Sequence, residues 1–197
     1  MKYLSILLVV FVTFVSCDDK GDLEKADQLY NKQEYEKAIE AYSKYLEMKP
    51  SKEIAIYNRG RAYEELGQYE EAVDDYNRVI EINPRNISAY LSYGKNFYRE
   101  KDYKNAAYQF EKAYKLNTNS SQAATLLARA YHKSGEVQNA MEYYDIAINN
   151  DDKNAEAYLF RGALKIHLNR ADGCTDLKLA KNIGYEGAED LYDQYCN

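Results

Sequence analysis

The sequence predicts an all-α fold in which one unit of two helices is repeated and stacked. Three series of residues recur every 34 positions along the 197-residue chain. Small residues form two of the series, Ala26, Gly60, Gly94, Ala128 and Gly162, and Ala38, Ala72, Ala106, Ala140 and Cys174. Aromatic residues form the third, Tyr42, Tyr76, Phe110 and Tyr144. A stack of repeats places the same kind of side chain at the same packing point in every unit, so these series indicate a solenoid.

The unit from Glu53 to Asn86 shows how each repeat is built. Its first helix carries Gly60 and Tyr63, and its second helix carries Tyr69, Ala72, Tyr76 and Val79, with Gly67 between the helices and Pro84 after them. This order resembles the tetratricopeptide repeat, a helix-turn-helix unit of 34 residues. The resemblance implies a right-handed α-α superhelix of about five repeats with a C-terminal capping helix at residues 188–196. The repeats are expected at residues 19–52, 53–86, 87–120, 121–154 and 155–186.

The small residues and the polar residues at unit boundaries predict local packing. We expect the small positions to lie where two helix backbones approach closely, because that distance limits side-chain size. Asn86, Ser120 and Asn154 stand where helices should begin, and are predicted N-caps. Asp22 and Lys25 make the first helix more polar than the others, as expected at the end of a stack.

Composition restricts the partners that the chain can bind. The sequence is 46% hydrophobic, which is enough for one ordinary domain with a continuous core. Its 26 Lys and Arg residues are outnumbered by 32 Asp and Glu, which gives a formal net charge of −6. Without a basic excess to displace counterions from phosphates, we expect no nucleic-acid partner.

The first 17 residues, MKYLSILLVVFVTFVSC, contain one basic residue, Lys2, and an apolar run from Leu4 to Val15. This run is shorter than the roughly 20 apolar residues of a membrane-spanning helix, so we expect a secretory signal. Residues 1–16 resemble a bacterial lipoprotein signal peptide, which implies cleavage before Cys17 and lipidation of that cysteine. Residues 17–21 would form a short tether to a tetratricopeptide domain at 22–197. The alternative is ordinary cleavage near Cys17, which leaves a soluble periplasmic protein.

Lipidation of Cys17 would determine where the protein resides. Several acyl chains bury enough methylene groups to hold a protein at a membrane. We therefore expect a lipid-anchored protein of the bacterial cell envelope, at the outer membrane on its periplasmic or surface face. The acidic residues Asp18 and Asp19 do not decide which membrane holds the protein. They resemble an inner-membrane retention signal of enterobacteria, but also a surface-export signal of Bacteroidetes.

The chain contains three cysteines. Lipidation of Cys17 would leave Cys174 and Cys196, and an exported protein favours their pairing in a disulfide. That bond would hold the capping helix against the fifth repeat, an ending that resembles the closing unit of repeat lipoproteins from Bacteroidetes. The alternative is that Cys174 is only the small residue of its series and that Cys196 lies at a frayed terminus.

No arrangement of residues predicts catalysis. The two histidines, His132 and His167, have no second ligand or nucleophile at a metal-site or triad spacing. The glycines punctuate helices and do not form a phosphate-binding loop. We therefore expect a protein that is not an enzyme and that needs neither a cofactor nor a metal.

Recognition of a partner is the better-supported function. In the family that the chain resembles, the first helices line a concave groove, and the ninth residue of each unit points into it. That series reads Asp27, Arg61, Lys95, Arg129 and Ala163. The same face is expected to carry Tyr57, Tyr98, Arg99, His132 and Lys133. We predict a groove for an extended protein segment that carries carboxylates and apolar or aromatic side chains.

Two alternatives to this groove remain open. Glu64, Glu65 and Glu100 are close enough in sequence to pair with some of the cations, in which case the stripe is a solvated charged face. The whole protein could also serve in another way than as a non-catalytic adaptor. It could be a structural subunit of an outer-membrane assembly or secretion complex, or a surface glycan-binding accessory lipoprotein.

Overall fold

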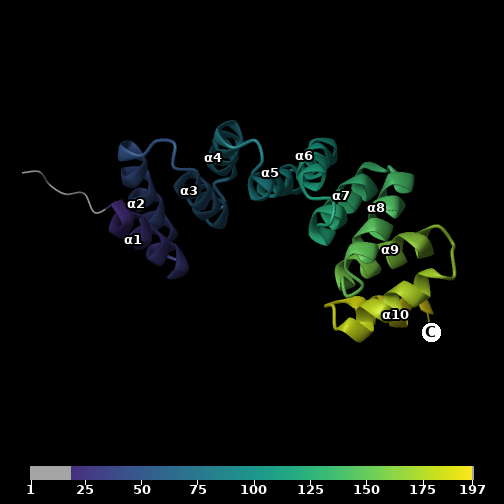
Figure 1. Cartoon of the computed structure of the whole chain (residues 1–197). Helices are drawn as coiled ribbons and strands as arrows, with labels where there is room; N and C mark the ends of the chain where they lie inside the picture. Colours follow the sequence, from purple (N-terminus) through teal and green to yellow (C-terminus); the bar gives the residue numbers. More distant parts are fainter. Residues whose placement is uncertain (1–18, 197) are drawn as a thin grey trace, which may run out of the picture.

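The computed structural model describes residues 19–196 and folds them into a chain of helices without a strand (Figure 1). The eleven helices of this part are α1 (Asp19–Asn31), α2 (Tyr35–Met48), α3 (Glu53–Glu65), α4 (Tyr69–Ile82), α5 (Ile87–Arg99), α6 (Tyr103–Leu116), α7 (Ser121–Ser134), α8 (Val137–Asn150), α9 (Ala155–His167), α10 (Gly173–Ile183) and α11 (Ala188–Cys196). Five helix pairs followed by one helix confirm the predicted all-α solenoid.

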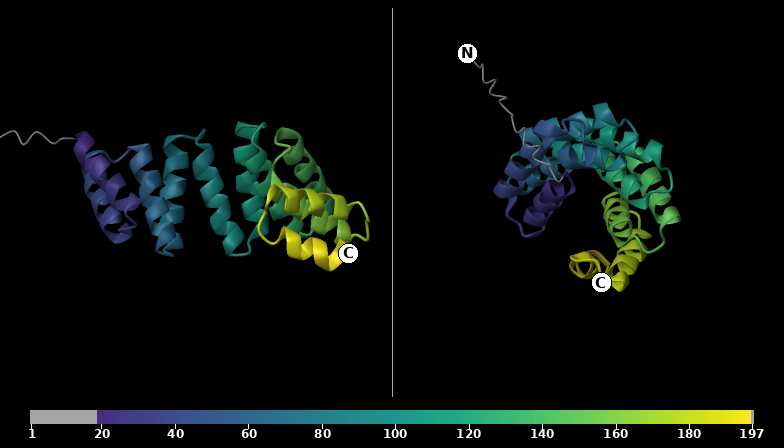
Figure 2. Two further views of the ribbon diagram at one scale, coloured as in Figure 1. Left: turned by 90° about the horizontal axis from the view of Figure 1, so that it is seen from below. Right: turned by 60° about the vertical axis from the view of Figure 1, so that its left-hand side comes forward.

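The helix pairs follow one another along a curved stack, and each helix packs mainly against its neighbours in sequence. Figure 2 shows the stack bending into an open arc with a concave side. The first helices of the central pairs, α3, α5 and α7, lie on the inner side of this arc, and the second helices, α4, α6 and α8, lie on the outer side. The last helix, α11, packs on α10 at the C-terminal end.

Helix boundaries agree with the predicted caps. The side chains of Asn86, Ser120 and Asn154 each accept a hydrogen bond from the backbone N–H three residues later, at 2.8, 3.1 and 2.9 Å. These bonds satisfy donors that an α-helix leaves unpaired at its start. The first helix, however, begins at Asp19, inside the predicted tether of residues 17–21.

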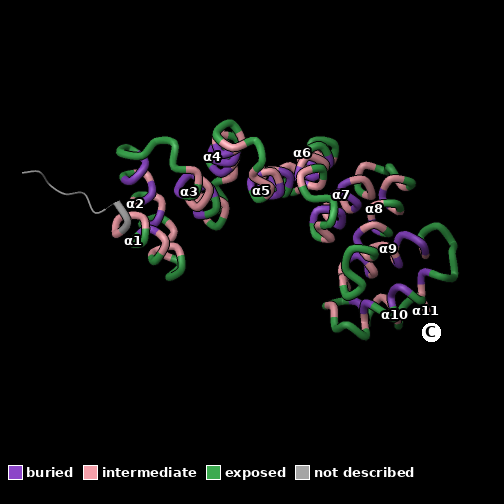
Figure 3. Tube along the Cα trace, viewed as in Figure 1, coloured by how far each residue is buried: buried purple, intermediate pink, exposed green. Residues whose placement is uncertain are grey.

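The core follows the aromatic series of the repeat. The side chains of Tyr42, Tyr76, Phe110 and Tyr144 are fully buried, one in each of the first four pairs. The alanines of the second small series are buried beside them. Figure 3 shows buried segments wherever neighbouring helices face one another and exposed segments in the connecting turns. The tyrosine-rich composition is thus explained by core packing.

At two of the small positions, side-chain size has a different cause from the one that we predicted. A Cβ atom added to Gly94 would lie 2.5 Å from Cε1 of Phe110, and one added to Gly60 would lie 2.9 Å from Cε1 of Tyr76. An aromatic ring of the second helix, rather than its backbone, therefore limits the side chain at these two glycines. At Gly162 an added Cβ would lie 2.9 Å from the backbone carbonyl oxygen of Gly173, and one added to Gly173 would lie 2.7 Å from that of Gly162, so close backbone approach limits side-chain size there, as predicted.

The turn inside each repeat contains one residue with a left-handed backbone, and its φ angle is between 58° and 85°. The five residues are again spaced by 34 and are Gln33, Gly67, Lys101, Gly135 and Asn169. Glycine adopts this conformation without steric cost, whereas a side chain with a Cβ does so only with strain. The sequence pattern pointed to the turn at Gly67, but not to its equivalents without glycine.

The fifth pair has a charge where earlier pairs have an aromatic ring. Lys165 is equivalent to Tyr63, Phe97 and Tyr131 at the spacing of 34. It is buried and binds Asp172 and Asp176 with N–O distances of 3.1 and 2.8 Å. A disulfide joins Cys174 on α10 to Cys196 on α11, with Cα atoms 5.6 Å apart. The capping helix is therefore tied to the fifth repeat, as the cysteine count favours.

The predicted signal peptide and Cys17 lie outside the described residues. Within residues 19–196, no helix combines the length and the apolar character that crossing a membrane requires. The anchor at Cys17 therefore remains a prediction from the sequence.

Candidate binding groove

Helices α5, α6 and α7 form a hollow of about 350 Å³ near the middle of the stack. Its lining residues are Lys95, Tyr98 and Arg99 of α5, Phe110 of α6, and Leu126 and Arg129 of α7. Three cations thus surround two aromatic rings and one leucine. Four of the eight residues predicted to line the groove meet at this hollow.

Arg129 is the most constrained of the three cations. Its Nη1 lies 2.6 Å from a carboxylate oxygen of Glu156, the second residue of α9. Its guanidinium carbon lies 5.2 Å from the ring centre of Tyr98 and 4.7 Å from that of Phe160. A cation over aromatic faces is attracted by their electron density. Arg129 therefore helps to join three successive inner helices, and its charge is partly compensated.

Arg99 is also paired within the protein. Its Nη2 donates to Glu64 at 2.9 Å, and its guanidinium carbon lies 4.1 Å from the ring centre of Tyr69. Glu64 in turn accepts a hydrogen bond of 2.8 Å from the hydroxyl of Tyr76. The prediction that Glu64 pairs with a groove cation is confirmed, so the solvated-face alternative holds for this arginine.

Lys95 and Arg61 differ from these two arginines. Both side chains are exposed, and neither forms an ion pair with any residue from 19 to 196 in this structure. Arg61 stacks on the ring of Tyr30, 4.7 Å from its centre, which orients the guanidinium but leaves its charge uncompensated. Both cations therefore keep an exposed charge that no described carboxylate compensates.

The other predicted groove residues lie apart from the central hollow. Tyr57 lines a separate hollow near the starts of α3 and α5, and its hydroxyl is 3.3 Å from Oγ of Ser92. His132 and Lys133 lie in the last turn of α7. The first member of the ninth-position series, Asp27, is structural, because it accepts hydrogen bonds from the hydroxyl of Tyr42 and from Asn58.

His132 is half-buried at the end of α7. Burial lowers the pKa of its imidazole below the ordinary value, and the neighbouring charges of Lys133 and His167 lower it further. A buried imidazole loses hydration when it is charged, which favours the neutral form. His132 is thus kept neutral at physiological pH and adds no charge to the groove.

Arg59 and Arg161 are two further arginines on inner helices, but both are structural. Nε and Nη2 of Arg59 bind the two carboxylate oxygens of Asp75 at 2.8 and 2.6 Å, and Nη1 donates to Ser43. Arg161 binds Asp176 in the same two-pronged way and also reaches Asp145. Each arginine therefore joins its own pair to the preceding second helix.

Sequence reasoning missed two features of this site. Glu156, the partner of Arg129, belongs to the next repeat, and comparing residue types at a spacing of 34 does not relate residues 27 apart. The second feature is a pair of buried polar atoms, Nε of Arg129 and the hydroxyl of Tyr144, that have no hydrogen-bond partner in the described structure. The equivalent hydroxyls of Tyr42 and Tyr76 both donate to carboxylates.

The described residues contain no cluster of histidine, cysteine, aspartate and glutamate that could hold a metal ion. The hollow offers cations, aromatic faces and a leucine, which are the groups used in non-covalent recognition of acidic and apolar side chains. Fold and site together define an α-solenoid scaffold for protein–protein interaction.

The comparisons with known proteins identify the family. Profiles described as "Tetratricopeptide repeat" match residues 54–86 and 97–172, and one described as "TPR repeat" matches residues 26–67. The chain belongs to the tetratricopeptide-repeat family, whose members bind peptide or protein partners and are typically non-catalytic scaffolds. Among curated proteins, none matches the chain.

Solved structures show the same fold. The MamA protein of Desulfovibrio magneticus RS-1 is 18% identical and superposes with a TM-score of 0.75, covering 91% of this chain and 97% of that one. YrrB is 22% identical with a TM-score of 0.74, covering 90% and 92%. TTC0263 of Thermus thermophilus is 17% identical with a TM-score of 0.67, covering 90% and 98%.

Proposed function

We propose that the protein is an adaptor of the bacterial cell envelope that holds an extended acidic segment of a partner protein in its concave groove. The observation that carries this proposal is the pair of exposed cations, Arg61 and Lys95, which have no acidic partner within residues 19–196. Such charges repel one another and gain no internal compensation, whereas a carboxylate of a partner would supply it.

The central hollow supplies the apolar part of the interaction. Tyr98, Phe110 and Leu126 line it together with Lys95 and Arg129, so one side chain with an apolar body and one carboxylate can be accommodated together. A bound segment is expected to alternate or interleave acidic residues with apolar or aromatic residues. YrrB, which shares the fold, is described as having an unusual peptide-binding site.

The envelope location rests on the N-terminal sequence. A lipid on Cys17 would stand only two residues before α1 begins at Asp19, so the repeats would be held close to the membrane. An adaptor so placed could collect partners from the periplasm or the cell surface without crossing the membrane.

Chemical cross-linking in intact cells, followed by mass spectrometry, tests the groove. The test variant carries Arg61→Glu and Lys95→Glu, and the control carries Lys104→Glu and Lys153→Glu, which are exposed lysines away from the hollow. We expect the control and the parent protein to cross-link to the same partner and the groove variant to lose it. A partner retained by the groove variant contradicts the proposal and favours recognition by the outer face.

A further inference from the structure

A further hollow, of about 360 Å³, lies between the second and third repeats, where α4 meets α5. It is separate from the central hollow and shares no lining residue with it. Its lining residues are Glu70, Val73 and Asp74 of α4, Tyr93 and Phe97 of α5, and Glu100, which follows α5. Three carboxylates thus surround two aromatic rings and a valine, and no lysine or arginine is among the lining residues.

The three carboxylates are not compensated within the described part of the chain. Glu70, Asp74 and Glu100 are exposed, and none of them forms an ion pair with another residue between 19 and 196. Glu70 and Asp74 are four residues apart on α4, a spacing at which like charges repel. Glu70 stands in the first turn of α4, where the helix dipole favours it, but Glu100 is the C-cap of α5, where the dipole opposes a negative charge. A cation bound in the hollow would relieve both repulsions.

Two stacked aromatic rings supply the apolar part of the lining. The ring centres of Tyr93 and Phe97 lie 4.8 Å apart, and their planes are inclined by 21°. Burial raises the pKa of the Tyr93 hydroxyl, and the charges of Asp74 and Glu100 raise it further, so both carboxylates lie near this ring. Aromatic faces beside carboxylates attract a cation that has an apolar stem.

Two other repeats have an arginine of the chain itself at this place. Tyr93 is the seventh residue of the third unit and is equivalent to Arg59 and Arg161. The guanidinium carbon of Arg59 lies 5.8 Å from the ring centre of Tyr63, the residue equivalent to Phe97. Arg161 binds a carboxylate of the preceding second helix, α8. In the third unit, the ring and the acidic residues line the hollow without such an arginine.

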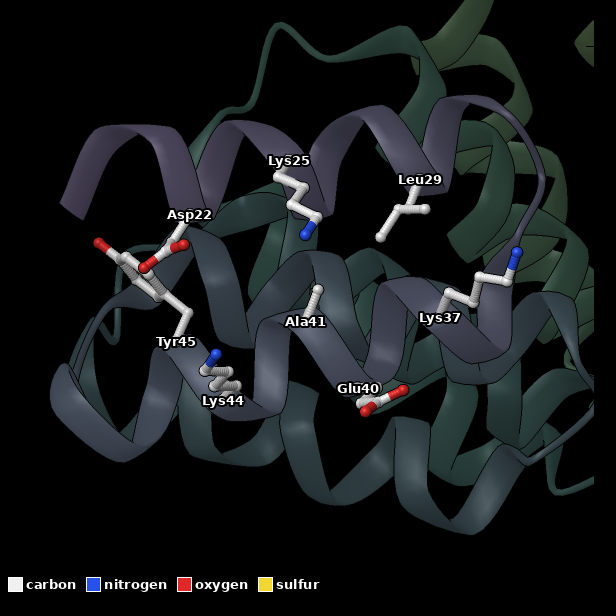
Figure 4. A pocket seen from close by; sticks show the side chains of 8 residues that line it. All are labelled: Asp22, Lys25, Leu29, Lys37, Glu40, Ala41, Lys44 and Tyr45. Carbon is white, nitrogen blue, oxygen red and sulfur yellow. The ribbon is translucent and has the colours of Figure 1, made fainter. Parts of the chain in front are cut away.

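The hollow between α1 and α2, of about 320 Å³, provides a contrast (Figure 4). Lys25 and Lys44 line it together with Asp22 and Glu40, so its lining carries both signs of charge. A lining of one sign selects a partner of the opposite charge, whereas a mixed lining does not. The hollow between α4 and α5 therefore has the more selective charge.

The size of the hollow indicates the kind of cation. Within residues 19–196, no group of acidic residues, histidines or cysteines is placed to hold a metal ion. The carboxylates instead surround a space of about 360 Å³, which can accommodate a long side chain. A planar guanidinium can stack on an aromatic ring and bind carboxylates at the same time. These properties favour arginine.

We propose that this hollow binds an arginine side chain from a basic segment of a partner protein. The guanidinium would stack on the rings of Tyr93 and Phe97, within reach of the carboxylates around them. This site is independent of the groove, because it uses other residues and attracts the opposite charge.

Titration with a defined peptide tests the site on the full-length chain in micelles of an uncharged detergent. The probe is acetyl-Leu-Arg-Leu-amide. The control peptide carries citrulline, which keeps the shape of arginine but lacks its charge. Backbone amide signals of the isotope-labelled protein in nuclear magnetic resonance spectra locate the bound peptide and give its dissociation constant.

Two variants with equal changes of net charge separate this hollow from the general acidity of the protein. The test variant carries Glu70→Gln, Asp74→Asn and Glu100→Gln. The matched control carries Glu47→Gln, Glu142→Gln and Asp152→Asn, which are exposed residues of the first and fourth repeats. Helical content measured by circular dichroism checks that both variants are folded.

We expect the arginine peptide to shift the signals of α4 and α5 around the hollow in the parent protein and in the control. The test variant should raise the dissociation constant by about tenfold or more, because three exposed charge contacts are lost together. The citrulline peptide should bind the parent protein at least about tenfold more weakly than the arginine peptide.

Several results would overturn the proposal. Signals that shift elsewhere, equal affinity of the test and control variants, or equal binding of the citrulline peptide would each do so. Displacement of the peptide by an equimolar amount of calcium would assign the hollow to a metal ion. Self-association of the parent protein that only the test variant abolishes would assign it to a second copy of the chain.

Discussion

Arg59 and Arg61 stand two residues apart on α3 and have opposite roles. Arg59 is 18% exposed and binds both oxygens of Asp75, which is 5% exposed, whereas Arg61 extends into solvent over the ring of Tyr30. Arg59, at the seventh position of its repeat, faces the preceding second helix, whereas Arg61, at the ninth position, does not. Two arginines on one helix can therefore differ in whether they stabilise the fold or remain exposed.

Arg129 is intermediate between these two. It occupies the ninth position, like Arg61, but it is half-buried against two rings and paired with Glu156. It therefore combines a structural contact with a place at the hollow. The three arginines are therefore expected to contribute to the stability of the fold to different degrees, and these contributions can be measured separately from binding.

The largest expected loss of stability follows substitution of Arg59. Arg59→Ala should lower the free energy of unfolding by about 3 kcal/mol, because it leaves the buried carboxylate of Asp75 without its partner. Arg61→Ala should lower it by less than about 1 kcal/mol, because it removes one exposed contact with the ring of Tyr30. Urea unfolding followed by circular dichroism measures both. Equal losses for the two variants would contradict the distinction between the seventh and ninth positions.

Arg129→Ala should lie between these values, with a loss of about 1 to 2 kcal/mol from one partly exposed ion pair and two ring contacts. The same unfolding experiment measures it. Glu156→Gln is the matched control, since it removes the ion pair and keeps the ring contacts. A control that loses as much as Arg129→Ala would show that the rings contribute little.

Substitution by glycine should have opposite effects on stability at two lysines of the third repeat. Lys101 has a φ angle of 64° in the turn, so Lys101→Gly relieves strain and should stabilise the protein by about 0.5 to 1 kcal/mol. Lys95 lies inside α5, and Lys95→Gly should destabilise by about 1 kcal/mol. Thermal melts of the two variants give the signs. A destabilised Lys101→Gly would mean that the lysine side chain makes a contact that outweighs the strain.

The smallest effect is a dependence on pH at His132. Its folded-state pKa is lowered, so the unfolded chain takes up this proton first as the pH falls below about 6.5. Stability that is present above that pH is therefore lost as the pH falls through the folded-state pKa. His132→Gln should lose less melting temperature than the parent when the pH is lowered from about 7.5 to about 5.5, one unit on either side of the ordinary histidine pKa. Identical losses would mean that carboxylates alone set this dependence.

Most of the fold could be predicted from the 34-residue spacing of the repeats. The spacing of 34 located the helix pairs and the caps Asn86, Ser120 and Asn154, and the family resemblance indicated α11 as a separate last helix. It failed where a contact crosses between repeats, as for Arg129 and Glu156, or where a strained residue such as Lys101 takes the place of glycine. A residue-type pattern records which positions are equivalent, but not which neighbours a side chain reaches across the stack.

The site was predictable to a smaller extent. Lys95, Tyr98, Arg99 and Arg129 were expected on one face and do meet at one hollow. Glu64 was named as a possible partner of these cations, but the sequence could not show that it pairs with Arg99 or that Glu156 pairs with Arg129, because these distances depend on how successive repeats are rotated. Exposed and paired cations look alike in the sequence and differ in what they offer to a partner.

The most direct test of the central claim is site-specific photo-cross-linking in intact cells. A photoreactive residue replaces either Lys95, in the groove, or Tyr108, which is 53% exposed on the outer helix α6. The groove account predicts a partner adduct from position 95 and none from position 108. An adduct from position 108 alone would contradict it and place recognition on the outer face of the solenoid.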